Sequence, residues 1–153
     1  YVKYDGATDI VGEKTYEEAV EAVKKGEFFF VKDSSNNVVI QYDINSLVTY
    51  ADRKDKTYSK NRVIRVQDSF KESIQNNFPP NKYDNDETGW NVMEGIGKSI
   101  LKLYEEAGAI KNVDYDNDFL VDRSKSTGDE TYFNIYLQPV DSAEKLFFTV
   151  KTN

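Results

Sequence analysis

The stretch RVIRVQDSFKESIQNNF at residues 62–78 carries the clearest structural pattern in the sequence. Apolar side chains recur in it at every third or fourth position. They are Val63, Val66, Phe70, Ile74 and Phe78. This spacing places them on one face of an α-helix, where they can pack against a core. Because proline cannot continue a helix, Pro79 and Pro80 predict that the helix ends near residue 78.

Two further segments have the features of helices. Residues 15–26 start with Thr15, a suitable N-cap, and end with Gly26, a suitable C-cap. Residues 88–107 carry a second apolar stripe, and Gly108 stops them. The stripe consists of Val92, Met93, Ile96, Ile100, Leu101 and Tyr104.

Two glycines interrupt this last predicted helix. Gly95 and Gly97 each cost about 1 kcal/mol relative to alanine in a helix interior. They either permit a close helix approach or mark a kink, and the sequence leaves both interpretations open.

Strand patterns occupy much of the remaining chain. Residues 28–31 and 38–42 flank Ser34-Ser35-Asn36-Asn37, which is a hairpin signal. Further strands are expected within 1–11, 118–122, 132–140 and 146–151, while the highly charged residues 51–60 predict a solvated loop. The predicted fold class is α+β: two to three helices packed on a mainly antiparallel sheet, with an extended C-terminal strand or arm.

Composition excludes several classes of function. The 153 residues carry a net charge of −7, which argues against binding nucleic acid, because phosphate backbones require clustered lysine and arginine. No apolar run is long enough to span a bilayer, so no membrane partner is expected. The sequence contains neither His nor Cys, and therefore lacks the commonest general base, the thiolate nucleophile and the usual zinc ligands.

Three weak motifs do not change this expectation. Residues 84–89 imitate the start of a calcium loop, but Gly95 stands where the bidentate glutamate belongs, and residues 114–118 lack both the glycine and the glutamate. Ser142-Ala143-Glu144-Lys145 has the spacing of an acyl-transfer motif without its companions. We therefore predict no enzyme, no cofactor, no metal site and no catalytic residue.

The last predicted strand has an apolar residue on each face. Leu146, Phe148 and Val150 share one face of the pleat, and Phe147, Thr149 and Lys151 share the other. A terminal strand either completes its own sheet or pairs with a neighbouring chain. We expect the second outcome, with these six residues as an interface between subunits. Because the sequence starts at Tyr1 rather than Met, we also expect it to be a fragment of a longer chain.

Short segments spread over nearly the whole chain carry a family resemblance. They are Tyr4-Asp5-Gly6-Ala7, Gly26-Glu27-Phe28, Asp43-Ile44-Asn45-Ser46-Leu47-Val48-Thr49, Lys60-Asn61-Arg62-Val63-Ile64-Arg65-Val66, Ala107-Gly108-Ala109-Ile110 and Gln138-Pro139-Val140-Asp141-Ser142-Ala143-Glu144-Lys145-Leu146. In their order and spacing the chain resembles the C-terminal portion of contractile phage tail sheath proteins, the group found in myophages, prophages and phage-tail-like bacteriocins.

The resemblance implies a structural subunit that polymerises around a tail tube through β-strand exchange and contracts without nucleotide hydrolysis. Its partners would be further copies in stacked rings, the tail tube protein, and the baseplate and tail-terminator proteins. It would act in a virion tail or tail-like particle assembled in the bacterial cytoplasm. The implied organisation is one C-terminal sheath domain over 1–153, with 1–14 as an extended connection and 144–153 as a C-terminal arm. Lys71 would contact the tube if the tube is acidic.

One alternative belongs to another class of protein. Tyr132 and Tyr136 lie on the same face of the strand predicted within 132–140. Such a tyrosine-rich face could belong to a small-ligand binding module or to an enzyme that depends on carboxylates.

Overall fold

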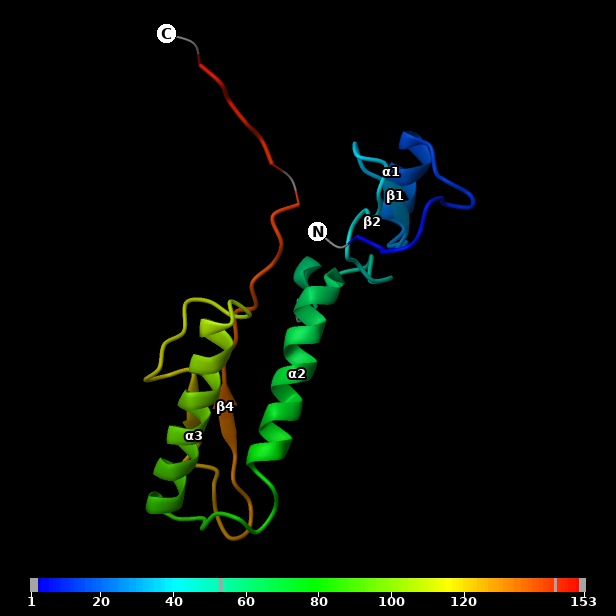
Figure 1. Ribbon diagram of the computed structural model, residues 1–153. Helices are drawn as coiled ribbons and strands as arrows, with labels where there is room; N and C mark the ends of the chain where they lie inside the picture. The colour runs from blue at the N-terminus through cyan, green and yellow to red at the C-terminus, as the bar shows by residue number, and fades with distance from the viewer. Residues whose placement is uncertain (1–2, 53, 145, 152–153) are drawn as a thin grey trace. The chain divides into compact units, whose positions relative to one another are not determined.

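The structure is a computed structural model that describes residues 3–52, 54–144 and 146–151. It divides into two compact units (Figure 1). The first unit combines residues 1–64 with 141–153, and the second unit consists of residues 65–140. Each unit is described by itself below.

The first unit begins with the short helix that the sequence predicts. Helix α1 spans Tyr16–Lys24, and Thr15 caps its N-terminus. The Thr15 hydroxyl accepts a hydrogen bond from the backbone N–H of Glu18, whose carboxylate accepts one from the N–H of Thr15. This reciprocal pair satisfies N–H groups that the first turn of a helix leaves without partners. Gly26 follows the helix with φ of 72°, as expected for a left-handed C-terminal position.

A β-hairpin completes the regular structure of the first unit. Strands β1 (Phe30–Lys32) and β2 (Val38–Ile40) pair antiparallel, as the sequence predicts. The turn between them contains Asn36 with φ of 62°, a conformation that asparagine tolerates. On the other side of β2, Lys3 forms an isolated bridge with Val39. The sequence predicted a strand within residues 1–11. In the described residues this prediction corresponds to the single bridge at Lys3, and Tyr1 and Val2 lie outside the described residues.

The charged segment 51–60 is more ordered than the predicted solvated loop. Its last part forms a 3₁₀ helix, η1, at Lys56–Ser59, and the side chain of Asp55 caps it. Ser59 is buried, and its hydroxyl donates a hydrogen bond to the carbonyl of Lys56 at 2.7 Å. The prediction of a loop rested on the high charge of this segment and overlooked that Asp55 can cap a short helix.

Helix α2 spans Asn61–Asn77, within one residue of the predicted helix. Val63 and Phe70 are buried, and Val66, Ile74 and Phe78 pack against the core of the second unit. The apolar face read from the sequence is therefore the face that the structure buries.

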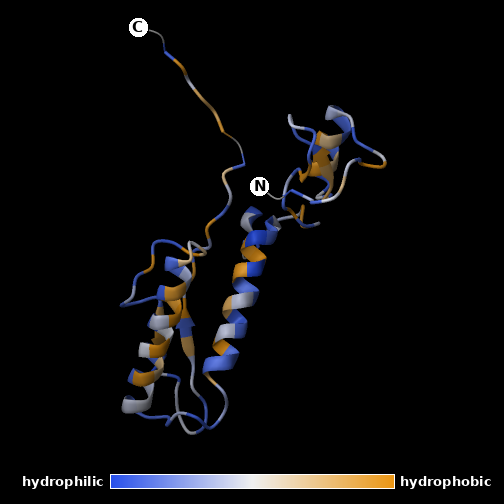
Figure 2. Cartoon of the chain, in the orientation of Figure 1, coloured by the Kyte–Doolittle hydropathy of each residue, from blue (hydrophilic) through white to orange (hydrophobic). Residues whose placement is uncertain are grey.

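The second unit packs α3 (Glu87–Glu106) against a small antiparallel sheet of β3 (Phe119–Val121) and β4 (Phe133–Ile135). Its buried core consists of Phe70, Ile100, Leu101, Ile110 and Phe119. The side chains of β4 alternate as predicted, because Phe133 and Ile135 pack on the core while Asn134 is exposed. In Figure 2 the hydrophobic residues recur along α2 and α3 with the helical period.

Gly97 settles one of the questions that the sequence left open. A Cβ atom at Gly97 would overlap the ring of Phe119 on β3, so this glycine permits a close approach. The partner is a strand rather than the helix considered from the sequence. A Cβ at Gly95, by contrast, would meet no atom of the described chain within 4 Å.

The fold class is α+β, as predicted, but two details differ from the expectation. The described strands form two separate two-stranded sheets rather than one larger sheet. Val92, placed in the inner stripe of the third predicted helix, is half exposed, whereas Glu94 is buried. Within the described residues, no helix has the length and apolar character needed to cross a membrane.

Candidate assembly interface

The described part of the C-terminal arm is extended and open to solvent. Its four large apolar side chains have exposed fractions of 65% for Leu146, 91% for Phe147, 83% for Phe148 and 87% for Val150. Thr149 and Lys151 are also exposed. Monomeric proteins rarely present so much contiguous apolar surface, and such surface marks an interaction site. Figure 2 shows this hydrophobic run as an extended trace.

The backbone of Leu146–Lys151 has no partner strand within the described chain. The sequence left two outcomes for this strand. In the described chain it does not complete a sheet of its own subunit. The segment offers a row of unpaired N–H and C=O groups flanked by aromatic side chains. Such a row is suited to pairing with the edge of another sheet.

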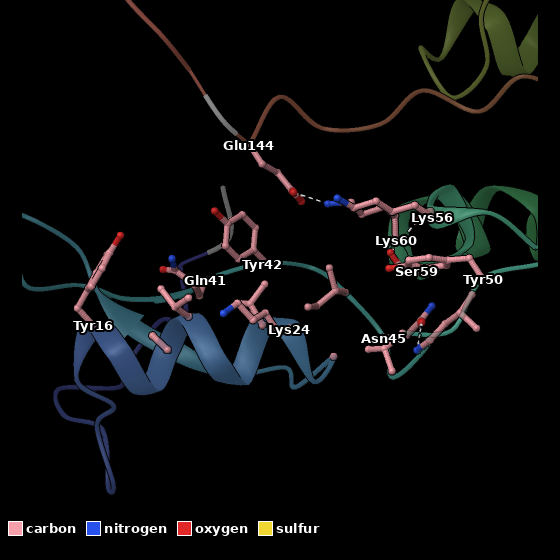
Figure 3. A pocket seen from close by; sticks show the side chains of 17 residues that line it. Tyr16, Lys24, Gln41, Tyr42, Asn45, Tyr50, Lys56, Ser59, Lys60 and Glu144 are labelled. Carbon is pink, nitrogen blue, oxygen red and sulfur yellow. Dashed lines mark hydrogen bonds and ion pairs between the residues drawn. The ribbon is translucent and has the colours of Figure 1, made fainter.

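The segment that leads into the arm, residues 141–144 and called the arm root from here on, is held to the rest of the first unit by side-chain contacts. The carboxylate of Glu144 forms an ion pair with the ammonium of Lys60 (Figure 3). Two residues earlier, the hydroxyl of Ser142 accepts a hydrogen bond from the Arg62 guanidinium at 3.5 Å. Within the described residues, these polar contacts of the arm lie at its root, before Leu146.

A groove of about 640 Å³ lies in the first unit beside this ion pair. One wall is the face of α1 that carries Val20 and Val23, and another is formed by Leu47 and Val48. Lys60 lies at the groove with its ammonium 5.9 Å from the centre of the Tyr42 ring, within the range of a cation–π contact. Figure 3 shows the groove side chains together with Glu144 and Lys60.

The remaining residues singled out in the sequence lie elsewhere. Lys71 is exposed on α2, and no ion pair holds it within the part of the chain that the structure describes. Tyr132 and Tyr136 are exposed beside β4, and the hydroxyl of Tyr132 donates to the Glu130 carboxylate at 2.8 Å. None of these three side chains belongs to the groove, whose lining comes from the first unit.

The acidic loop before α3 is used for local structure. The Asp86 carboxylate caps α3 by accepting a hydrogen bond from the N–H of Gly89 at 2.8 Å. The Asn85 amide donates to the carbonyls of Gly128 and Glu130, both at 3.0 Å, and so ties this loop to a distant turn. Of the Ser-x-x-Lys motif, Ser142 belongs to the arm root, and Lys145 lies outside the described residues.

A buried carboxylate in the second unit had no counterpart among the sequence predictions. Glu94 accepts hydrogen bonds from the N–H of Val121 at 2.9 Å and from the Arg123 guanidinium at 2.7 Å. Burial raises the pKa of Glu94, but the hydrogen bonds from Arg123 and Val121 outweigh it and hold that pKa below its ordinary value. The Arg123 guanidinium also lies over the Trp90 ring, 5.9 Å from its centre. This cluster joins α3 to β3 and is structural.

A family model for the phage tail sheath C-terminal domain matches residues 53–153. The chain belongs to this family of structural tail proteins. Among curated proteins, the phage-like element PBSX protein XkdK of Bacillus subtilis (strain 168) is 29% identical over 163 residues, covering 100% of this chain and 35% of XkdK. The uncharacterized protein YqbK of the same organism is 27% identical, covering 99% of this chain and 34% of YqbK. The chain thus spans about a third of the length of these relatives.

Solved structures give the same result. The sheath tail protein of Desulfitobacterium hafniense is 30% identical with a TM-score of 0.80, over 98% of this chain and 35% of that protein. The sheath tail protein of Listeria innocua is 30% identical with a TM-score of 0.75, over 98% and 36%. A chain of the anti-feeding prophage baseplate shares the fold at 16% identity and a TM-score of 0.79, over 99% and 43%.

The sequence interpretation missed the contact between Lys60 and Glu144. Both residues stood in segments quoted for the family resemblance, yet they are 84 positions apart. No local pattern connects residues at that separation. For Glu94 a signal existed, because the residue is three and seven positions from Gly97 and Leu101, and this spacing places it on the buried face of α3.

Proposed function

We propose that the chain is part of a structural subunit of a contractile tail sheath. In this proposal it polymerises around a tail tube by lending the strand Leu146–Lys151 to a second copy, and the sheath contracts without nucleotide hydrolysis. The observation that carries the proposal is the exposed, unpaired backbone and apolar side chains of this segment. Membership of the tail sheath family and the sheath proteins among the similar structures support it.

The energy available from one exchanged strand is moderate. About five backbone hydrogen bonds would form, at a net gain of about 1 kcal/mol each. Burial of Phe147, Phe148 and Val150 would add about 1.5–3 kcal/mol for each side chain. Ordering the arm opposes part of this gain, so a single joint is weak. Repetition of the same joint through a closed or helical array makes the assembly stable.

The hairpin of the first unit has an edge that can receive such a strand. Strand β1 pairs with β2 on one side, and the described chain supplies no strand for its other side. On β2 the corresponding position is bridged by Lys3. We therefore favour β1 of a second copy as the acceptor of the arm.

The other expected partners follow from the same proposal. They are the tail tube protein, the baseplate and the tail-terminator proteins, within a virion tail or tail-like particle that assembles in the bacterial cytoplasm. Lys71, exposed on α2, is proposed to face an acidic tube. A Lys71→Glu subunit that still assembles around the tube would remove this assignment.

Proline substitutions in the full-length parent protein test strand exchange directly. Deleting residues 144–153 should abolish tube formation while leaving the subunit soluble. Adjacent N–H groups of a strand point to opposite sides, so either Phe148→Pro or Thr149→Pro must remove a donor from the new ladder. We expect at least one of them to prevent tubes in negative-stain microscopy, whereas the controls Phe148→Leu and Thr149→Val assemble. Normal tubes from both proline variants would refute strand exchange.

The tyrosine-rich alternative gains no support from the geometry. Tyr132 and Tyr136 project from the exposed side of β4 and its continuation, and the 640 Å³ groove is lined by residues of the first unit instead. A ligand module would be expected to place its aromatic side chains around a concave site. The sheath subunit therefore remains the function that we propose.

A further inference from the structure

We infer that Lys60 and Glu144 are a positioning pair that keeps the root of the arm in its own subunit. Exchange with a second copy then begins beyond Glu144 and not at it. The inference rests on the proposed strand exchange and names the residues that set where the exchanged segment starts.

The first observation is a change in exposure along the arm. The side chains of Lys60 and Glu144 are only 12% and 21% exposed, whereas Leu146 is 65% exposed and Phe147 91%. Asp141, Ser142 and Ala143, which precede Glu144, are exposed as well. Among the described residues of 141–151, Glu144 is therefore the one that is not exposed, and the arm is open to partners from Leu146 onward.

The second observation is that Lys60 sits on a well-supported backbone. Its N–H donates to the carbonyl of Thr57 at 3.1 Å, and it forms an isolated bridge with Ile44. The next residue, Asn61, donates its side-chain amide to the Asp43 carboxylate and to the Ile44 carbonyl, both at 3.0 Å. Lys60 is therefore a fixed point to which a flexible segment can be attached.

The third observation concerns charge. The Lys60 ammonium lies between the Tyr42 ring and the Glu144 carboxylate, with little exposure to water. A poorly hydrated ammonium needs an anionic partner, and losing that partner leaves a cation in an unfavourable site. The Glu144 carboxylate supplies this negative charge. Because both side chains are largely covered, the ion pair differs from an exposed pair on the surface.

The consequence for assembly is a shorter tether. Before Glu144, the chain is next held at Ser142, whose hydroxyl accepts the hydrogen bond from Arg62. Without the ion pair, the free segment leading to Leu146 would start at Ser142 instead of Glu144 and be about twice as long. Because the effective concentration of a tethered strand falls as about the −3/2 power of tether length, it would drop about threefold.

Substitutions of Glu144 in the full-length protein test this inference. We expect Glu144→Gln to raise the protein concentration at which tubes form by about threefold, with no change in the fold of the soluble subunit. Lys60→Glu should behave similarly, and the charge swap Lys60→Glu with Glu144→Lys should restore assembly. Lys56→Glu is the matched control, since Lys56 also lines the groove but forms no ion pair with Glu144 in the described chain. A Glu144→Gln variant that assembles like the unmodified protein, or a swap that gives no rescue, would overturn the pair.

Cross-linking decides whether the pair lies within one copy. The 153 residues contain no cysteine, so introduced thiols are specific within this region. We expect a short bifunctional maleimide to link Lys56→Cys and Ala143→Cys when one chain carries both, because these positions lie beside the pair and leave Lys60 and Glu144 intact. Tubes mixed from single-substituted chains should give no covalent dimers, and dimers in those tubes would contradict the inference.

Deletion of residues 146–153 distinguishes failure of this inference from failure of the proposed strand exchange. Normal tubes from the deletion would mean that strand exchange itself is wrong. If the deletion blocks assembly while Glu144→Gln has no effect, strand exchange stands and the positioning role of Lys60 and Glu144 falls.

Discussion

The two units of this chain both bury apolar side chains, Val38, Val39, Ile44 and Val63 in the first unit among them, but they differ in how many large ones they leave exposed. The second unit buries Phe70, Met93, Ile100, Leu101, Ile110, Phe119 and Val121. The first unit, with the arm, exposes Tyr4, Val11, Tyr16, Val20, Phe28, Val48, Tyr50, Leu146, Phe147, Phe148 and Val150. The second unit leaves far fewer exposed, and these are Val92, Leu103, Tyr132 and Tyr136.

This difference separates a region whose large apolar side chains are mostly covered within the subunit from a region that leaves many of them exposed. In the second unit, even the buried charge of Glu94 is satisfied by Arg123 and the N–H of Val121. In the described part of the first unit, Tyr16 and Val20 on α1 and the apolar side chains of the arm remain exposed. Exposed apolar area of that extent is characteristic of a surface that a partner buries.

The same substitution in each unit should give the sharpest contrast. Phe119 is 1% exposed, so Phe119→Ala should destabilise the second unit by about 3–5 kcal/mol. Phe148→Ala should leave stability unchanged within about 0.5 kcal/mol, because the exposed ring contacts little in the subunit. Amide hydrogen exchange in the full-length protein measures both, at α3 for Phe119→Ala and at α1 and β2 for Phe148→Ala. Equal loss of protection in the two variants would remove the distinction between the units.

Two glycines on one helix provide a finer test of packing in the second unit. Gly97→Ala should destabilise it by about 2 kcal/mol, because the added Cβ overlaps the Phe119 ring and this cost exceeds the gain in helix propensity. Gly95→Ala meets no described atom within 4 Å and should stabilise α3 by up to about 1 kcal/mol. Urea denaturation measures the two shifts, and shifts of the same sign would contradict the close approach at Gly97.

The buried carboxylate should give a smaller, pH-dependent effect. Glu94→Gln is expected to cost about 1 kcal/mol near neutral pH, since a neutral amide bonds Arg123 less strongly. The pKa of folded Glu94 lies below its ordinary value of 4.5, so its contribution is present above pH 4.5 and disappears as pH falls through the folded pKa. Denaturation at several pH values should show the difference between protein and variant shrinking in acid. A constant difference would argue against an ionised Glu94.

Much of the fold could be predicted because its signals are local. The period of Val63, Val66 and Phe70 fixed α2, and the capping residues Thr15 and Gly26 fixed α1 to within two residues. The division into two small sheets could not be predicted, because strand pairing depends on contacts between residues far apart in the chain. The 3₁₀ helix η1 escaped prediction because charged side chains obscured its short capping pattern.

The candidate interface stays a prediction, and it too came from a local pattern. The alternating apolar residues from Leu146 to Val150 indicated a strand, and a strand with unpaired edges suggested exchange. The residue that contacts the beginning of this segment could not be predicted, because that contact depends on tertiary structure. Only the folded chain brings Glu144 next to Lys60 across the intervening 84 positions.

The proposed pairing of the arm with the edge of β1 in a second copy has a consequence for growth. If every copy passes its strand in the same direction, a row of copies always finishes with a vacant edge at one extremity and an unused strand at the other. Such a polymer has polarity, and each extremity requires a different capping protein. Because the unused strand exposes Phe147 and Phe148, that extremity would be the more prone of the two to aggregate.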